Sequence, residues 1–204
     1  MADMTGTVLR MSGGDEFQGL YLSCMPMVDA KVNTVGRAIE FCTKPHLGLE
    51  TTKSYPYERL GRGIPNWSEK HYQMKQRYRI SSIVRVADKE EYKQKLLENY
   101  GDEGQSFPCV AMLRMGDFKD NLVARRCALE NDPYHHPQEP TSDEQAVELY
   151  GEEHAVLIVG INTTSENTLK HYCEVKNTYG EEWGDKGFSK VGFEVFDYVL
   201  FPRL

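Results

Sequence analysis

The chain has 204 residues and a mass of 23.4 kDa, which is enough for one large domain or for two small lobes that share an interface. Lys and Arg number 24 and Asp and Glu 31, which gives a formal net charge of −7, and the hydrophobic share of 40% is ordinary for a soluble protein. This acidic balance excludes nucleic acid as the main partner, because no basic stripe is available to neutralise phosphates.

The first third of the chain predicts a short extended segment, a helix and a loop. The extended segment covers residues 5–11. Over residues 28–42, apolar side chains recur at steps of three or four with one slip, which is typical of an amphipathic helix. Pro45 is expected to end that helix, because the residue before a proline resists the helical region. Residues 55–67 are rich in Pro, Gly and Arg and predict a loop.

The middle of the chain predicts a strand, a helix, a second strand and a long connection. Residues 78–86 have the β-branched content of a strand. Asp88 is expected to cap a helix over residues 89–100, whose early acidic side chains suit the positive end of the helix dipole. A second strand is predicted over residues 110–114. Residues 120–140 are rich in turn-forming residues and are interpreted as a long surface excursion.

The last third predicts a short helix followed by strands. Thr141 or Ser142 is expected to cap a helix that ends at Tyr150, with an acid or amide at capping-box spacing. The outline is a helical lobe over residues 1–60 and a β-rich lobe over residues 61–204. The strands expected after the helix cover residues 155–159, 171–176 and 188–195.

Two segments of the last third carry the most specific pattern in the chain. Residues 153–160 read Glu-His-Ala-Val-Leu-Ile-Val-Gly, with His154 in second place. Residues 171–188 read His-Tyr-Cys-Glu-Val-Lys-Asn-Thr-Tyr-Gly-Glu-Glu-Trp-Gly-Asp-Lys-Gly-Phe and contain Asn177 and Trp183. A histidine followed at this distance by an amide and spaced glycines is compatible with a core histidine satisfied by a neighbouring side chain, and also with a catalytic pair.

This order and spacing resembles the C-terminal signature of papain-like cysteine peptidases of the C1 type. In that family a His-Ala-Val strand is followed by Lys-Asn-Ser-Trp-Gly, two residues, Trp-Gly, two residues and Gly-Tyr. Here Thr178 stands for Ser, Tyr179 for the first Trp and Phe188 for Tyr. Three upstream stretches resemble further family segments, namely residues 5–12, 48–58 and 78–113.

The resemblance implies an α+β papain-like two-lobe fold, with a helical N-terminal lobe and a β-barrel-like C-terminal lobe. It implies that His154 is the catalytic base, that Asn177 orients its imidazole, and that the indole of Trp183 shields their bond and borders the substrate. In such enzymes a thiolate attacks the peptide carbonyl while the histidine takes and returns the proton. The ion pair with imidazolium makes the thiolate, because a free thiol of pKa about 8.5 is mostly protonated at neutral pH.

The nucleophile segment is the part of the resemblance that this sequence does not supply. In the family a Gln-Gly-x-Cys-Gly-Ser-Cys-Trp stretch opens the central helix and precedes the segment that residues 5–12 resemble. Only four residues stand before Thr5, so the nucleophile, its glutamine and the central helix are expected to be missing or replaced. The alternative is Cys24, which follows Gln18 at the family's spacing of six and would open the helix over residues 28–42.

The remaining features limit which cofactors and which cellular location are expected. The cysteines are odd in number and lack metal-site spacing, so we expect reduced, mostly buried thiols, no metal and no cofactor. His135 and His136 stand in a Pro-rich loop and are interpreted as solvated. No apolar run approaches the roughly 20 residues that cross a bilayer. We expect a cytoplasmic protein without membrane contact, or a secreted or vacuolar one whose signal and pro-segment were removed.

Three functions follow from these observations. The first is a papain-like protein without peptidase activity, a pseudoenzyme that binds a peptide, protein or small-molecule ligand in the remnant cleft. A missing central helix would expose an apolar groove, so a homodimer or a partner helix is expected to cover it. The second is an active cysteine peptidase that uses Cys24, His154 and Asn177. The third is a small-molecule enzyme in which His154 acts as a general base.

Overall fold

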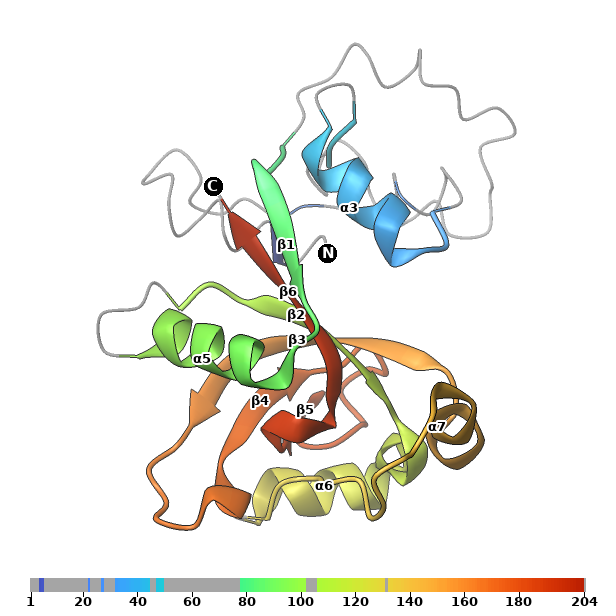
Figure 1. Cartoon of the computed structure of the whole chain (residues 1–204), viewed down its shortest axis with the longest axis vertical. Coiled ribbons are helices and arrows are strands. Elements are labelled where there is room, and N and C mark those ends of the chain that lie inside the picture. Colours follow the sequence, from blue (N-terminus) through green and yellow to red (C-terminus); the bar gives the residue numbers. More distant parts are fainter. Residues whose placement is uncertain are drawn as a thin grey trace. The chain divides into compact units, whose positions relative to one another are not determined.

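The computed structural model describes residues 4–5, 22, 27, 32–44, 47–49, 78–101, 106–130 and 132–203. The chain divides into two compact units, the first made of residues 1–84 with 202–204 and the second of residues 85–201 (Figure 1). The predicted lobe junction near residue 60 lies outside the described residues, as do Gln18 and Cys24. The expected absence of the central helix also concerns a stretch of which little is described. Of the segment predicted as extended over residues 5–11, only Thr5 is described, and it is helical.

The first unit contains helix α3, which covers Val35–Thr43. The helix begins later than predicted because the Thr34 side chain accepts a hydrogen bond from the backbone N–H of Arg37 and so caps its N-terminus. Its end is as predicted, since Lys44, just before the proline, has an extended backbone. The buried side of α3 belongs to a small apolar cluster formed by Leu22, Met27, Phe41, Cys42 and Leu49.

The sheet has six strands in the order β1-β6-β2-β3-β4-β5. The pairs β2–β3, β2–β6, β3–β4 and β4–β5 are antiparallel. The sheet is open, which corrects the expectation of a barrel-like lobe: β1 and β5 stand at opposite edges, whereas closure requires the edge strands to pair. The strands are β1 Ser82–Val86, β2 Cys109–Arg114, β3 Glu153–Asn162, β4 Tyr172–Lys176, β5 Phe188–Val191 and β6 Phe196–Arg203.

The strand predicted over residues 188–195 is two elements in the structure. After β5, Gly192 leads into a short 3-10 turn, η5, which covers Phe193–Val195. Strand β6 follows and was not predicted. It pairs with β2, and together with β3 it encloses β2 so fully that all six β2 residues are buried.

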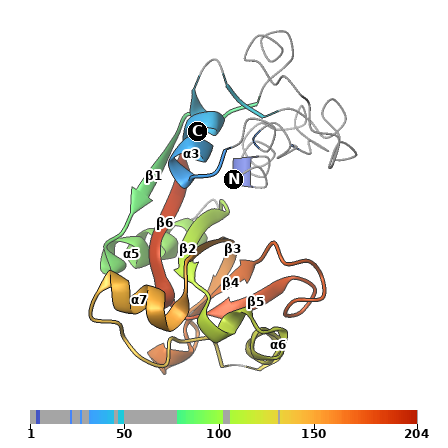
Figure 2. The same cartoon turned by 90° about the vertical axis from the view of Figure 1, so that its right-hand side faces the viewer.

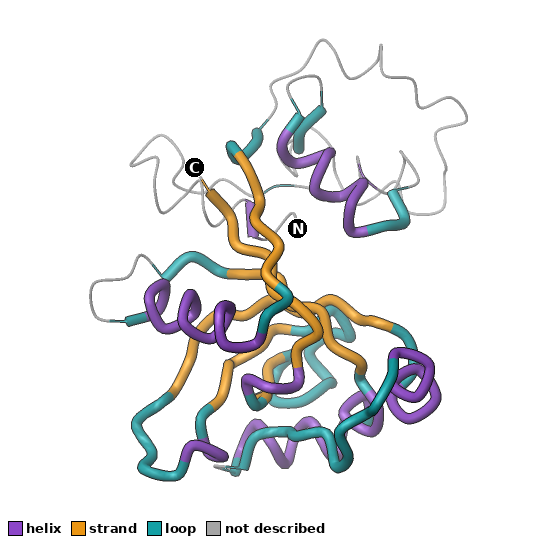
Figure 3. Tube along the Cα trace, viewed as in Figure 1, coloured by secondary structure: helices purple, strands orange, loops and turns teal. Residues whose placement is uncertain are grey.

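Three α-helices and a 3-10 turn surround the sheet of the second unit (Figure 3). Asp88 caps α5 and Ser142 caps α7, both as predicted. Helix α6 lies inside the stretch interpreted as a surface excursion, and that interpretation was wrong: Asp120 caps it, and Ala124 and Cys127 bury one of its faces. The bounds are α5 Lys89–Tyr100, η3 Gly116–Lys119, α6 Asn121–Leu129 and α7 Asp143–Tyr150.

Helix α6 packs against β5, and both α6 and α7 contact η3. The turn η3, which follows β2, lies between the two helices in both views of the molecule (Figures 1 and 2). Helix α5 packs on β3 and η5. Its Tyr92 is fully buried and donates its hydroxyl to the carbonyls of Phe193 and Phe196, at 2.8 and 3.1 Å. Among the helices in the described ranges, none has the length and apolar character needed to span a membrane.

Candidate functional site

His154 and Asn177 meet although 23 positions separate them in the sequence. His154 is the second residue of β3, where it stands opposite Leu113 of β2. Asn177 follows the last residue of β4, the next strand of the sheet. The distance from His154 Nε2 to Asn177 Oδ1 is 2.8 Å, which is a good hydrogen bond. Antiparallel pairing of β3 and β4 therefore brings together the two residues that the motifs singled out.

The amide of Asn177 is oriented by the chain itself. Its Oδ1 also accepts the backbone N–H of Thr178, at 2.6 Å. With the amide turned the other way, two N–H donors would face each other, so Oδ1 is the atom that faces His154. Because Asn177 Oδ1 is an acceptor, His154 Nε2 must carry the proton and donate it. Nδ1 then carries a lone pair and no proton. Within the described residues Nδ1 has no hydrogen-bond partner.

The Nδ2 group of Asn177 is a hydrogen-bond donor without an acceptor among the described residues. Asn177 is only 6% exposed, and its Nδ2 has no partner within the described part of the chain. A buried amide left without an acceptor costs about 1–3 kcal/mol. Such groups are uncommon in folded proteins, and each one has a structural or functional reason.

A glycine-rich loop holds Asn177 in place after β4. The backbone N–H of Asn177 donates to Gly187 at 2.9 Å, and the N–H of Gly187 donates to Trp183 at 2.8 Å. Gly184 has φ of +63°, and a Cβ on it would lie 2.2 Å from the carbonyl oxygen of Phe188. Its N–H donates to the side chain of Asn121 at 2.9 Å, which ties the loop to α6. The motif glycines thus allow a turn that a larger residue would block.

The aromatic ring beside His154 is that of Tyr179. The two ring centroids are 4.9 Å apart, and Tyr179 is 49% exposed. Trp183, for which the resemblance implied shielding and substrate contact, is one ring further away: it meets Tyr179 edge-on at 6.3 Å. It is 3% exposed, and its indole N–H donates to the carbonyl of Phe118 at 3.3 Å.

The motif comparison contained the signal for Tyr179. This residue stands where the family signature has its first tryptophan, directly after the residue that follows the asparagine. The sequence resemblance implied the shielding role for the second tryptophan position, Trp183, instead.

The described thiols are poor nucleophiles. Cys42, Cys109, Cys127 and Cys173 are free and buried, as predicted. Burial raises the pKa of each thiol, and that of Cys109 reaches about 12. A thiol with a raised pKa is protonated at neutral pH and reacts slowly.

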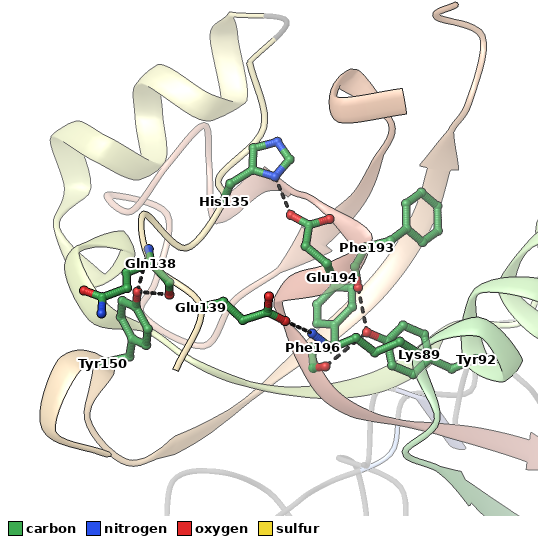
Figure 4. A network of polar contacts seen from close by, with 9 residues as sticks. All are labelled: Lys89, Tyr92, His135, Gln138, Glu139, Tyr150, Phe193, Glu194 and Phe196. Carbon is green, nitrogen blue, oxygen red and sulfur yellow. Dashed lines mark hydrogen bonds and ion pairs between the residues drawn. The ribbon is translucent and has the colours of Figure 1, made fainter. Parts of the chain in front are cut away.

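His135 and His136 are only partly exposed and both are hydrogen-bonded within the fold, which corrects the interpretation that they are simply solvated. His135 Nδ1 contacts the carboxylate of Glu194 (Figure 4). Its Nε2 lies 2.8 Å from the carbonyl of Leu169. His136 Nε2 lies 3.1 Å from the carbonyl of Arg114. Both histidines are therefore used by the fold. In the described ranges no three His, Cys, Asp or Glu side chains gather as metal ligands would.

The two partners of His135 determine its charge. A carboxylate and a carbonyl only accept hydrogen bonds, so the ring must carry both protons to satisfy them. The hydrogen bond with Glu194 accordingly raises the pKa of His135 above its usual range. Gly192 makes room for this contact, since a Cβ there would lie 2.6 Å from His135 Cε1. By contrast, burial lowers the pKa of His136.

Comparison with known proteins agrees with the fold. The family described as papain family cysteine protease matches residues 128–196, which include both His154 and Asn177. No curated protein sequence matches the chain. Among solved structures, the proform of a ragweed pollen allergen cysteine protease matches with a TM-score of 0.60 at 17% identity, over 98% of this chain and 56% of that one.

Two further structures show the same likeness. Bromelain from Ananas comosus gives a TM-score of 0.62 at 15% identity, over 100% of this chain and 86% of that one. Digestive procathepsin L2 from Tenebrio molitor gives 0.56 at 21% identity, over 90% of this chain and 53% of that one. The chain thus spans little more than half the length of the ragweed and Tenebrio proteins. It has the papain-like fold, as the sequence motifs predicted, and its residues 128–196 match the papain family of cysteine proteases.

Proposed function

We propose that this chain is a papain-like protein that binds a peptide or protein partner beside His154 and does not itself cleave peptide bonds. The observation that carries the proposal is the state of the thiols. Every cysteine in the described part of the chain is buried with a raised pKa, and none is hydrogen-bonded to His154.

Peptide cleavage in this family needs a thiolate in contact with an imidazolium. His154 has the nitrogen for that task, because Nδ1 has no partner among the described residues. A buried thiol cannot supply the other half, since desolvation disfavours the charged form. A base with no nucleophile beside it among the described residues retains the ability to accept a hydrogen bond.

The surface beside His154 has the features of a binding site. Tyr179 presents a half-exposed ring beside the His154 imidazole, on a loop that glycine geometry and the hydrogen bond from Gly184 to Asn121 hold in place. Tyrosine is enriched at protein interfaces because its ring buries much area at low entropic cost. We infer that an N–H or hydroxyl of the ligand donates to His154 Nδ1 while an apolar group covers Tyr179.

The preserved geometry of the pair favours a second candidate, an active cysteine peptidase with Cys24 as nucleophile. The proton on His154 Nε2 leaves Nδ1 as the base, which is the arrangement that thiol activation needs. The same geometry would serve a general base in a small-molecule reaction. Both alternatives depend on His154, but only the first depends on Cys24.

Alkylation kinetics distinguish these functions. The rate of iodoacetamide modification at Cys24 is measured by peptide mass mapping in the wild type and in His154→Ala, with Cys24→Ala as the blank. We expect a rate typical of an ordinary thiol and no change in His154→Ala. A fast rate below pH 7 that His154→Ala abolishes would replace our proposal with the peptidase function. Turnover of a small ester that needs His154 but survives Cys24→Ala would support the general base.

Binding is tested on a peptide array with Tyr179→Ala and His154→Ala. We expect both variants to lose binding about 10-fold or more, as for aromatic and hydrogen-bonding residues at the centre of an interface. Tyr172→Ala is the matched control, because Tyr172 lies on β4 and its ring meets Lys190 instead of His154. Equal losses in all three variants, or no binding by the wild type, would contradict the proposal.

A further inference from the structure

Helix α6 presents an apolar and basic face to solvent. Leu122 is 78% exposed and Leu129 63%, and Arg125 and Arg126 are exposed between them. Spacings of three, four and seven residues place these four side chains on one side of the helix, with the leucines along its middle. The opposite side is buried against the second unit, so this helix covers the core and leaves two leucines in water.

Helix α7 presents a face of opposite charge. Glu144 and Glu148 are exposed and four residues apart, which places them next to each other on the helix surface. Val147 and Leu149, 38% and 39% exposed, lie on either side of this acidic pair. Like charges at this spacing repel each other and destabilise a helix.

Neither face is neutralised within the described residues. The ion pairs found there leave out both arginines of α6 and both glutamates of α7. The two helices flank η3, which contacts both of them (Figures 1 and 2). A basic apolar face and an acidic apolar face therefore stand on the two sides of one short turn.

We propose that this surface binds a second copy of the chain, with α6 of each copy on α7 of the other across a two-fold axis at η3. Pairing α6 with α6 would oppose arginines, and pairing α7 with α7 would oppose glutamates. Only the crossed arrangement places Arg125 and Arg126 against Glu144 and Glu148. A two-fold interface of this kind uses the same patch twice, so both charge contacts and both apolar contacts are formed in duplicate.

The energetics favour a reversible dimer. The leucines supply the apolar contact, because their exposed area is removed from water in the dimer. The charge pairs determine how the helices align and disfavour the other pairings. They contribute less to affinity. A stable interface buries roughly 800 Å² on each partner, so the two helix faces need η3 between them to reach that size. This inference does not depend on the function proposed for His154.

Charge reversal in trans tests the proposal. The variant Arg125→Glu with Arg126→Glu, and the variant Glu144→Lys with Glu148→Lys, are each studied alone and as an equimolar mixture by sedimentation velocity. We expect a wild-type dimer, a dissociation constant raised about a hundredfold in each variant alone, and recovery of a dimer in the mixture. Recovery occurs because both contacts of the mixed dimer again join opposite charges.

Other outcomes would overturn the dimer. A wild type that stays monomeric at all attainable concentrations, a dimer that neither reversal weakens, or a mixture that stays monomeric each contradicts the crossed pairing. Leu122→Ser with Leu129→Ser is expected to weaken the wild-type dimer. Leu97→Ser, at an exposed leucine of α5, is the matched control and should leave the dimer unchanged. Circular dichroism of each variant confirms that the fold is retained.

Discussion

Two histidines of the second unit differ in how many of their ring nitrogens are hydrogen-bonded, and this number determines whether the ring can still bind a ligand. His154 gives one nitrogen to Asn177 and keeps the other without a partner among the described residues. His135 uses both, one toward Glu194 and one toward Leu169. The first ring can still accept a proton or a hydrogen bond. The second joins three segments of chain and has nothing left for a ligand.

The two sites also differ in what holds them. The loop that carries Asn177 depends on backbone conformation, because Gly184 has positive φ and touches the Phe188 carbonyl. The His135 site depends on charge, because a protonated ring bridges a carboxylate and a carbonyl. Substitutions at the first should act at every pH, whereas the second should respond to pH.

The largest effect is expected from Gly184→Ala. The new Cβ would lie 2.2 Å from the Phe188 oxygen, so the loop must move, at a cost of about 2–4 kcal/mol in the free energy of unfolding. Gly180→Ala is the matched control: it has φ of +89° but no atom within 4 Å of a new Cβ, so only the backbone strain of about 1–2 kcal/mol applies. Urea unfolding of both variants measures the difference. Equal losses would mean that the contact with Phe188 does not restrain the loop.

Asn177→Ala should have a smaller but more specific effect. It removes the acceptor of the His154 Nε2–H and of the Thr178 N–H, at a cost of about 1–3 kcal/mol. The tautomer of His154, read from ¹⁵N chemical shifts, should change from Nε2–H alone to a mixture. In the same spectrum His135 should not change. A wild-type His154 protonated on Nδ1 would contradict the orientation derived for the amide.

The smallest effect is expected from His135→Gln, and it should depend on pH. Because Glu194 raises the pKa of His135, the stabilisation is fully present below the unfolded-state pKa of about 6.5 and is lost as pH rises through the folded-state value. Both side chains are partly exposed, 30% and 53%, so the difference just below about pH 6.5 should be about 0.5–1 kcal/mol.

The stabilisation from the pair of His135 and Glu194 should also be lost in acid. Burial alone would raise the pKa of Glu194, but the bond from His135 and nearby charges outweigh it and lower that pKa. The stabilisation from this carboxylate is lost as pH falls through its folded-state value. Unfolding curves of wild type and His135→Gln between pH 4 and 8 should therefore diverge most in the middle of this range. Glu194→Gln should give the same pH profile. A difference in the free energy of unfolding that does not depend on pH would contradict a stabilising ion pair between His135 and Glu194.

Local signals predicted the helices well where the capping residue decided the boundary. Asp88 and Ser142 each accept a backbone N–H three residues on, and α5 and α7 begin where these residues predicted. At α3 the cap was missed: apolar spacing extended the helix back to residue 28, whereas Thr34 begins it. Periodicity alone does not mark an N-terminus, because flanking apolar residues can continue the pattern by chance.

Helix α6 was missed because its sequence carries few apolar residues on the buried side. Ala124 and Cys127 are small, while the larger Leu122 and Leu129 face solvent, so the pattern did not predict an amphipathic helix. Strand β6 was missed for a different reason. The 3-10 turn after Gly192 lies within a stretch of alternating apolar residues, so the sequence pattern does not reveal it. Only the pairing of β6 with β2 shows that a new strand begins after the turn.

The sequence by itself predicted the papain-like fold and identified His154 and Asn177, because the order and spacing of the motif residues are set by the strand and turn geometry of that fold. Tertiary structure decided what neighbours each group has. It placed Tyr179 next to the imidazole, buried the four described thiols, turned the Asn177 oxygen toward Nε2 and gave His135 its two acceptors. These outcomes depend on contacts between segments far apart in the chain, whose distances no local pattern encodes.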